Sequence, residues 1–156
     1  MQHSDYMKLA LKEAKYAHSI GEAPVGCVIV YDGQVIGRGH NTRETGHTAL
    51  GHAELSAISQ ACQAVGSWRL SGCSLYVTME PCPMCMGAII NARISRVIFG
   101  AYDFKAGCCG SAVDFNQLGF NHRPEIFSGI LENECASLLS DFFGRLRNQP
   151  EKNQKI

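Results

Sequence analysis

The feature that most constrains this chain is a pair of short motifs about thirty residues apart. The first, H-A-E, occupies residues 52–54, and the second, E-P-C-P-M-C, occupies residues 80–85. One histidine and two cysteines supply three zinc ligands and leave the fourth tetrahedral position open for water, as a catalytic site requires. A fold of this chain must therefore bring His52, Cys82 and Cys85 to one point.

Glu54 is a carboxylate beside this set that is not needed as a ligand. The pattern H-x-E followed by P-C-x-x-C is typical of zinc-dependent deamination of nucleobases, with that glutamate as general acid and base. In this hydrolysis water attacks an amino-bearing ring carbon and ammonia leaves. A positioned acid/base group contributes typically ~10²–10⁴ in rate. The sequence predicts Glu54 as the catalytic residue and one Zn²⁺ per chain, held by His52, Cys82 and Cys85.

Cys82 and Cys85 by themselves allow other interpretations. A lone C-x-x-C is also typical of a redox pair or of half a closed structural zinc site, and either would make the protein a non-enzymatic or redox module. A closed site needs a fourth ligand, and the remaining candidates, the pair at 108–109 and His122, lack the usual spacing. The upstream motif at 52–54 favours catalysis.

The length predicts a single domain. A chain of 156 residues is long enough for one core, and we expect one zinc-dependent deaminase domain at 1–149 and a polar, disordered tail at 150–156. No apolar run approaches a membrane span and no signal-peptide pattern is present, so we expect a cytoplasmic protein without membrane association.

Six of the eight cysteines are expected to be thiols without a metal; a disulfide framework is the competing interpretation.

The charge of the chain is balanced. Fourteen Lys and Arg residues offset fourteen Asp and Glu residues, giving a formal net charge of zero. This balance counts against a nucleic-acid substrate, although a neutral protein can still carry a basic face.

Hydrophobic periodicity and turn residues predict the elements. A helix follows the N-cap Ser4-Asp5 and ends before Gly21, and further helices are expected at 52–65, 83–92 and 131–147, with a short one at 112–118. Strands are expected at 25–30, 34–40, 73–79, 96–101 and 125–129, the first two forming a hairpin. Trp68 and Tyr76 are expected in the core. This order predicts a three-layer α/β/α sandwich with a mixed five-stranded sheet.

The spacing of the site residues also constrains their geometry. His52 and Glu54 are two apart on a helix and point in separate directions, so both can serve one site only if it caps the helix end. Cys82 and Cys85, three apart in a first turn, share a face near the positive end of the helix dipole. Two helix N-termini are therefore predicted to converge on one metal, a setting that favours thiolate.

Motifs beyond the zinc ligands carry a family resemblance. They lie at 23–26, 39–41, 49–54, 93–94, 97–101, 103, 105, 110–111, 121–123 and 139–143. With them the sequence resembles the cytidine and deoxycytidylate deaminase superfamily, and within it the bacterial tRNA-specific adenosine deaminases, across nearly the whole chain. Guanine and cytosine deaminases share the zinc motif but do not typically end in a double phenylalanine and a basic helix.

The resemblance implies a substrate, partners and a fold. It implies a cytidine deaminase-like fold, a homodimer, and conversion of adenosine to inosine at the wobble position of a tRNA anticodon loop. The alternative is a deaminase of a free base or nucleoside, such as guanine, cytosine or cytidine. An anticodon stem-loop assay separates the two.

The resemblance also implies substrate contacts. Asn41 is expected to hydrogen-bond the flipped nucleotide, Pro24 to wall the base pocket, and the backbone around Ala53 to face the base edge. Asp103 and Lys105 are expected near the flanking nucleotides. The anticodon-loop surface is expected to include His122, Phe143, Arg145 and Arg147. Such contacts suit RNA loops, which are read through splayed bases, aromatic stacking and 2′-hydroxyl groups.

Overall fold

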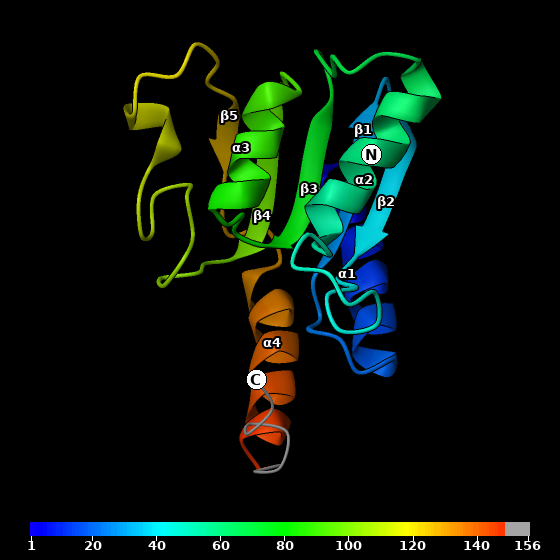
Figure 1. Cartoon of the computed structure of the whole chain (residues 1–156), viewed down its shortest axis with the longest axis vertical. Coiled ribbons are helices and arrows are strands. Elements are labelled where there is room, and N and C mark those ends of the chain that lie inside the picture. The colour runs from blue at the N-terminus through cyan, green and yellow to red at the C-terminus, as the bar shows by residue number, and fades with distance from the viewer. Residues whose placement is uncertain (149–156) are drawn as a thin grey trace.

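The computed structural model describes residues 1–148 as a five-stranded sheet flanked by four α-helices (Figure 1). The helices are α1 (His3–Ser19), α2 (Ala53–Val65), α3 (Pro83–Asn91) and α4 (Glu132–Arg147), with a 3-10 turn η1 (Phe115–Gln117). The strands are β1 (Gly26–Tyr31), β2 (Gln34–His40), β3 (Ser74–Met79), β4 (Arg96–Ala101) and β5 (Glu125–Phe127). In the described range, no helix is long and apolar enough to cross a membrane.

The sheet is mixed, as predicted. Its order is β2-β1-β3-β4-β5, with β1 antiparallel to both β2 and β3 and with β3, β4 and β5 parallel. The antiparallel part therefore extends beyond the predicted hairpin. Because β3 and β4 are parallel, the segments that follow them leave the sheet at the same edge, and Cys82 lies on one of these segments.

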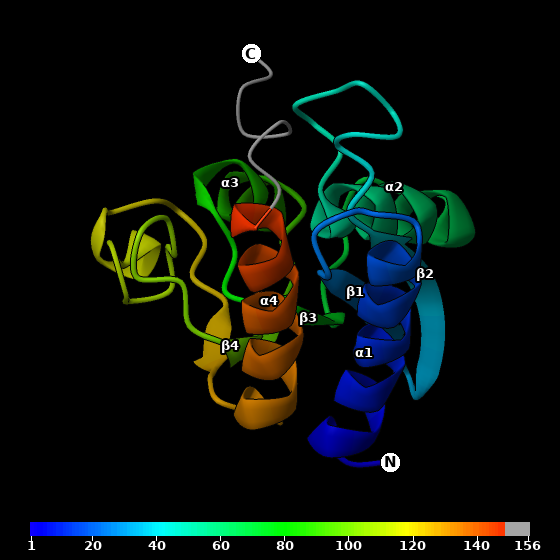
Figure 2. The same cartoon turned by 90° about the horizontal axis from the view of Figure 1, so that it is seen from below.

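The sheet separates two helical layers (Figure 2). Helices α1 and α4 cover one face and α2 and α3 cover the other, which confirms the three-layer prediction. Alternate strand residues face opposite layers, as the pleat requires. Cys27, Ile29, Leu75, Val77, Val97 and Phe99 pack under α2 and α3. Val28, Val30, Tyr76 and Ile98 pack under α1 and α4.

Glycines let α2 approach the sheet closely. A Cβ added to Gly39 in β2 would collide with the carbonyl oxygen of Ala53, and one on Gly37 would collide with that of Ala57. The backbone of α2 therefore rests directly on β2. This contact fixes the first turn of α2, which carries Glu54.

Most predicted elements lie within two residues of their observed bounds, with some exceptions. Helix α1 begins at His3 because the Gln2 N–H donates to the Asp5 side chain at 2.9 Å and closes the N-terminus there. The helix expected at 112–118 is only the turn η1. The tail predicted at 150–156 lies outside the described residues.

The prediction for Trp68 is wrong, whereas Tyr76 is buried as expected. Trp68 comes two residues after Gly66, whose left-handed backbone (φ 70°) ends α2, so it does not lie on the helix face that packs on the sheet. Its ring lies 59% exposed under the Arg69 guanidinium, 4.9 Å from the ring centroid.

Candidate active site

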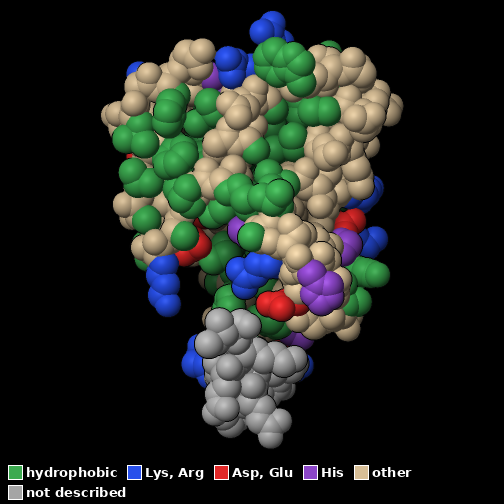
Figure 3. All heavy atoms as spheres, viewed as in Figure 1, with side chains coloured by type: hydrophobic (Ala, Val, Ile, Leu, Met, Phe, Trp, Pro, Cys, Tyr) green, Lys and Arg blue, Asp and Glu red, His purple; other side chains and the backbone are tan. Residues whose placement is uncertain are grey.

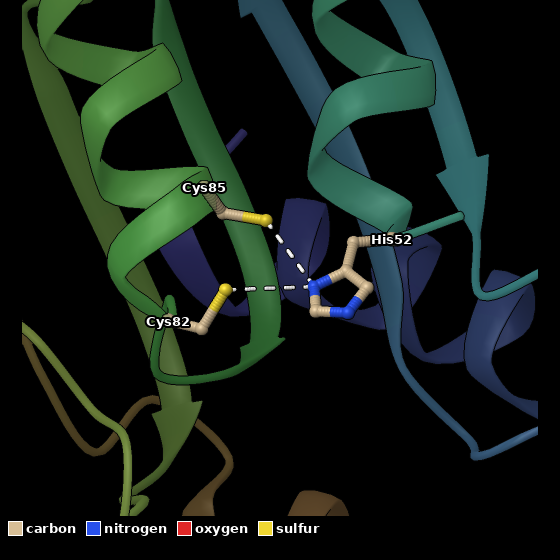
Figure 4. Close-up of side chains that lie close together, drawn as sticks. All are labelled: His52, Cys82 and Cys85. Atoms are coloured by element: carbon tan, nitrogen blue, oxygen red, sulfur yellow. Dashed lines mark hydrogen bonds between the residues drawn. The ribbon is translucent and has the colours of Figure 1, made fainter. Parts of the chain in front are cut away.

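The three predicted zinc ligands lie together at two helix N-termini (Figure 4). His52 is the N-cap of α2 and Cys82 the N-cap of α3, while Cys85 lies in the first turn of α3. The His52 Nδ1 atom lies 3.5 Å from the Cys82 sulfur and 3.4 Å from the Cys85 sulfur. Pro83, the first residue of α3, suits this start because a helix leaves its first N–H groups unpaired.

This geometry fits zinc. Zn–S bonds of about 2.3 Å and Zn–N bonds of about 2.0–2.1 Å at tetrahedral angles separate nitrogen from sulfur by about 3.5–3.6 Å. The observed separations of 3.5 and 3.4 Å match this edge of a tetrahedron. Within residues 1–148, the trio is the one group of three or more metal-ligating side chains close enough to share an ion. A site with three protein ligands leaves one coordination position for substrate or water.

The ligand set is electrostatically coupled. The neighbouring Cys85 thiol and the His52 ring lower the pKa of Cys82 to about 4, against the opposing effect of burial. The pKa of Cys85 is raised by its hydrogen bond to Cys82 and by burial. The hydrogen bond to Cys82 raises the pKa of His52. These contacts therefore favour the thiolate form of Cys82, which is the form that binds a metal.

Glu54 lies beside the ligands without joining them. It occupies the first turn of α2, is 4% exposed and lines the same cleft as His52 and Cys82. Burial raises its pKa to about 7. A buried carboxyl group at the floor of a cleft is placed to exchange protons with a bound molecule.

A cleft of about 900 Å³ opens above these residues. Its walls come from the end of α1, the loop 41–51, the segment after β4, and the C-terminal half of α4. Five residues predicted to contact substrate line it: Asn41, Ala53, Asp103, Phe143 and Arg145. Its volume is large enough for a nucleoside-sized ligand.

Residues 1–101 match the family described as the cytidine and deoxycytidylate deaminase zinc-binding region. The chain belongs to this deaminase family. The matched range contains His52, Cys82, Cys85 and Glu54, so the zinc cofactor predicted from the two motifs is confirmed at the level of the family.

Individual deaminases resemble the chain over almost all of its length. A tRNA-specific adenosine deaminase of Bacillus subtilis (strain 168) is 50% identical over 151 residues, covering 96% of this chain and 94% of the relative. One of Agrobacterium fabrum (strain C58 / ATCC 33970) is 45% identical over 148 residues, covering 94% and 97%.

Solved structures share the fold. One from a study of A-to-I editing by tRNA:A34 deaminases at the wobble position has a TM-score of 0.83 and 44% identity, covering 86% of this chain and 99% of that chain. A guanine deaminase from Bacillus subtilis has a TM-score of 0.63 and 32% identity, covering 78% and 88%.

Four further residues predicted for this deaminase lie outside the cleft lining. Pro24 is buried between Ala23 and Val25, which do line it. Lys105 and Arg147 are exposed near the rim-forming segments. His122 bonds the Ile94 carbonyl oxygen through Nε2 at 2.7 Å, beside the start of β4 and hence at the opposite edge of the sheet. Their roles stay predictions.

Sequence reasoning missed two buried carboxylates of the deaminase cleft, Glu22 and Glu80, which are 1% and 2% exposed. Glu22 accepts hydrogen bonds from loop 41–51, and Glu80 accepts them from the segment after β4. The position of Glu80, one proline before Cys82, could have identified it from the sequence as a residue of the site. Glu22 carries no such signal.

Proposed function

We propose that this deaminase hydrolyses adenosine to inosine at the wobble position of a tRNA anticodon, releasing ammonia. The observation that carries the substrate assignment is 50% identity over 96% of the chain to a protein named as a tRNA-specific adenosine deaminase. The chemistry is carried by the zinc-compatible trio beside Glu54 at the floor of the cleft.

The chain's residues divide the catalytic work. His52 Nδ1 and the sulfurs of Cys82 and Cys85 would hold the metal. Zinc, when bound, lowers the pKa of coordinated water to about 7, so that a nucleophile exists at neutral pH. A carboxylate oxygen of Glu54 takes one proton from the attacking water and delivers it to the ring nitrogen of adenine. It then carries the remaining hydroxyl proton to the amino group, which leaves as ammonia and leaves a carbonyl on the ring.

The cleft walls orient the nucleotide. Asn41 is 8% exposed, and its Oδ1 accepts the Arg43 N–H at 2.9 Å, which leaves its amide NH₂ to bond the flipped nucleotide. The backbone at Ala53 faces the base edge from the first turn of α2, and Pro24 backs the wall that Ala23 and Val25 form. Water is excluded from the base by the walls of the cleft.

The anticodon-loop surface extends from the cleft over α4 and the segment after β4. Phe143 and Arg145 line the cleft, and the exposed Arg147 lies one helical turn after Phe143. Asp103 and Lys105 approach the flanking nucleotides from the other wall. We assign His122 to the same surface through the partner subunit, because it lies at the far edge of its own sheet. Residues 1–149 act together as one deaminase domain.

The active form is a homodimer. Helix α3 carries no charged residue, and hydrophobic side chains gather on the face that α2 and α3 form (Figure 3). Leu55, Ile58, Met84 and Ala88 on these helices are only partly buried. Covering such a face is typical of subunit association.

Light scattering should report a dimer for the wild type, a monomer for Ala88→Arg, and a dimer for the control Ser137→Arg on α4. A monomeric wild type would contradict the assignment.

The reaction takes place in the cytoplasm, where tRNA is available. None of the eight cysteines is paired in a disulfide, which suits a reducing compartment. Fractionation of cells that express the protein, followed by immunoblotting, tests this location; recovery outside the cytoplasmic fraction would contradict it.

An anticodon stem-loop with adenosine at the wobble position tests the function. Conversion to inosine, read by sequencing, is expected, whereas a stem-loop with guanosine at that position should remain unchanged. The alternative substrate is a free base such as guanine, favoured by the 32% identity to a guanine deaminase. Ammonia release from guanine, cytosine or cytidine, with no conversion of the stem-loop, would overturn the tRNA assignment.

A further inference from the structure

Phe104 presents the most exposed aromatic ring in residues 1–148, at 79%. The ring lies nearly parallel to that of Tyr102, with 17° between the planes and 6.1 Å between the centroids. Tyr102 is anchored, since its hydroxyl donates to Ser128 Oγ at 3.0 Å and its ring meets Phe99 edge-on at 5.3 Å. An apolar ring that remains in water contributes little to the core, so folding does not explain Phe104.

The backbone before Phe104 is held by the buried carboxylate of Glu80. One of its oxygens accepts the Asp103 N–H at 3.1 Å. The other accepts the N–H groups of Cys109 and Ser111 at 2.9 and 3.1 Å. Both ends of the segment 103–111 are therefore tied to the residue that precedes the cysteine motif.

Contacts within the segment close the turn around Phe104. The Asp103 Oδ1 accepts the Lys105 N–H at 3.1 Å, and the Asp103 carbonyl accepts the Gly107 N–H at 2.8 Å. Gly107 is packed so tightly that an added Cβ would collide with the Glu80 side chain. The ring of Phe104 is thus exposed to solvent on a backbone that is held in one conformation.

Phe104 directly follows Asp103, a residue of the active-site cleft. Its Cα is only about 3.8 Å from that of Asp103. A ligand whose reacting part occupies the cleft would extend its neighbouring parts over this segment. An aromatic ring there offers a flat apolar surface next to the ligand.

We infer that Phe104 is a stacking platform for a nucleobase adjacent to the target adenosine. The inference rests on the proposed function, because an anticodon loop supplies unpaired bases on both sides of its wobble nucleotide. Bases splayed out of an RNA loop stack on aromatic side chains. Since every base has a flat face, such a platform raises affinity with little sequence preference. The preset turn limits the conformational entropy lost on binding.

Three variants test the contribution of the ring. Phe104→Ala and Phe104→Leu should each lower kcat/KM on the stem-loop by about 5- to 150-fold, the loss that follows removal of one stacking partner. Leucine separates stacking from plain hydrophobic contact because it keeps the apolar bulk. Phe104→Tyr should stay within about twofold of the wild type, since it retains the aromatic face. Trp68→Ala is the matched control, an exposed aromatic outside the cleft lining, and should leave kcat/KM unchanged.

Altered substrates identify the stacked base. Stem-loops with an abasic site on the 5′ or the 3′ side of the target are assayed with the wild type and Phe104→Ala. At one of the two positions, the abasic site should lower the activity of the wild type but should lower that of Phe104→Ala only a little further. This is expected because loss of the base and loss of the ring remove the same contact. Additive losses at both positions would overturn the inference.

The outcomes also separate this inference from the proposed function. If the wild type converts the stem-loop and Phe104→Ala converts it equally well, the stacking role is rejected while the proposed function stands. Absence of wild-type conversion rejects both. A change of oligomeric state in Phe104→Ala, measured by light scattering, would assign the ring to a protein contact and overturn the inference; an unchanged state supports it.

Discussion

The Glu22 carboxylate accepts the backbone N–H of Thr45 at 2.6 Å, and its other oxygen accepts that of Glu44 at 3.2 Å. This buried group lies just after α1 and anchors the middle of the loop 41–51. That loop begins with Asn41 and runs into the N-cap of α2. Glu22 therefore connects the end of one helix to the wall of the cleft.

Replacing Glu22 by glutamine should lower the free energy of unfolding by about 1–3 kcal/mol. In the wild type both carboxylate oxygens accept a backbone N–H, whereas in the variant the NH₂ group faces one of these two N–H donors and cannot accept its hydrogen bond. Urea unfolding of both proteins at neutral pH and equal zinc concentration measures the difference. Asp32→Asn, an exposed acid in the β1–β2 turn, is the control and should not affect the loop.

The Glu22→Gln difference should also depend on pH. Burial raises the pKa of Glu22, but the N–H groups of Thr45 and Glu44 outweigh this effect and leave the pKa lowered. A carboxyl group with a lowered folded-state pKa contributes stability above its unfolded value of about 4.3, and loses it as the pH falls through the folded value. The difference in the free energy of unfolding between the wild type and Glu22→Gln should therefore become smaller in acid. A gap that widens on acidification would contradict this account.

Glu80→Gln should loosen the segment 103–111. The glutamine side chain cannot accept hydrogen bonds from all the N–H groups that point at the Glu80 carboxylate. Hydrogen exchange at the backbone N–H groups of Cys109 and Ser111 should therefore accelerate, and the free energy of protection should fall by about 1–3 kcal/mol. Exchange measured by NMR on the zinc-loaded protein detects this. The matched control is Glu125→Gln, an exposed acid in β5. Unchanged protection at both amides would mean that Glu80 does not hold the segment.

The sequence predicts features that depend on near neighbours. Gly66, the residue directly after the helix predicted at 52–65, ends α2 with a left-handed backbone. The turn of the predicted hairpin has positive φ at both Asp32 and Gly33 (49° and 76°). The placement of His52 and Cys82 at helix ends follows from spacing alone. In each case the determining interactions lie within a few residues.

Features set by distant partners were not predictable. Glu22 and Glu80 bond backbone groups 22 to 31 residues away, and no spacing rule identifies such partners. The antiparallel pairing of β1 with β3 is likewise long-range. The position of Phe143 and Arg145 over the cleft follows from how α4 packs on β4, which the helical period does not specify. Only the family resemblance indicated it.

Glu54→Gln should abolish most inosine formation while leaving the metal in place. Glutamine keeps the shape but cannot carry the proton, so the rate should fall by ~10²–10⁴. Glu44→Gln, an exposed acid on the same cleft, should retain activity. Single-turnover assays are paired with metal analysis, where about one zinc per chain is expected in all three proteins. Full activity in Glu54→Gln would refute the assigned mechanism.

Removing zinc should both inactivate and destabilise the protein. Binding to the folded state alone stabilises it by ~2.7 kcal/mol when free zinc is 100 times the dissociation constant. Thermal unfolding with and without a chelator should show this shift in the wild type and in Cys62→Ser, whose thiol lies outside the site. Cys85→Ser should respond weakly. An equal zinc response in Cys85→Ser would exclude that residue as a ligand.

The two helix N-termini that carry the metal site share no residue with the segment 103–111 or with α4. The metal site and the proposed contacts to the flanking nucleotides are therefore encoded in separate stretches of the gene. A directed-evolution library can randomise the segment around Phe104 and the exposed face of α4 while 52–54 and 80–85 stay constant. Glu80 belongs with the constant part, because each new sequence of that segment still requires its carboxylate as an anchor.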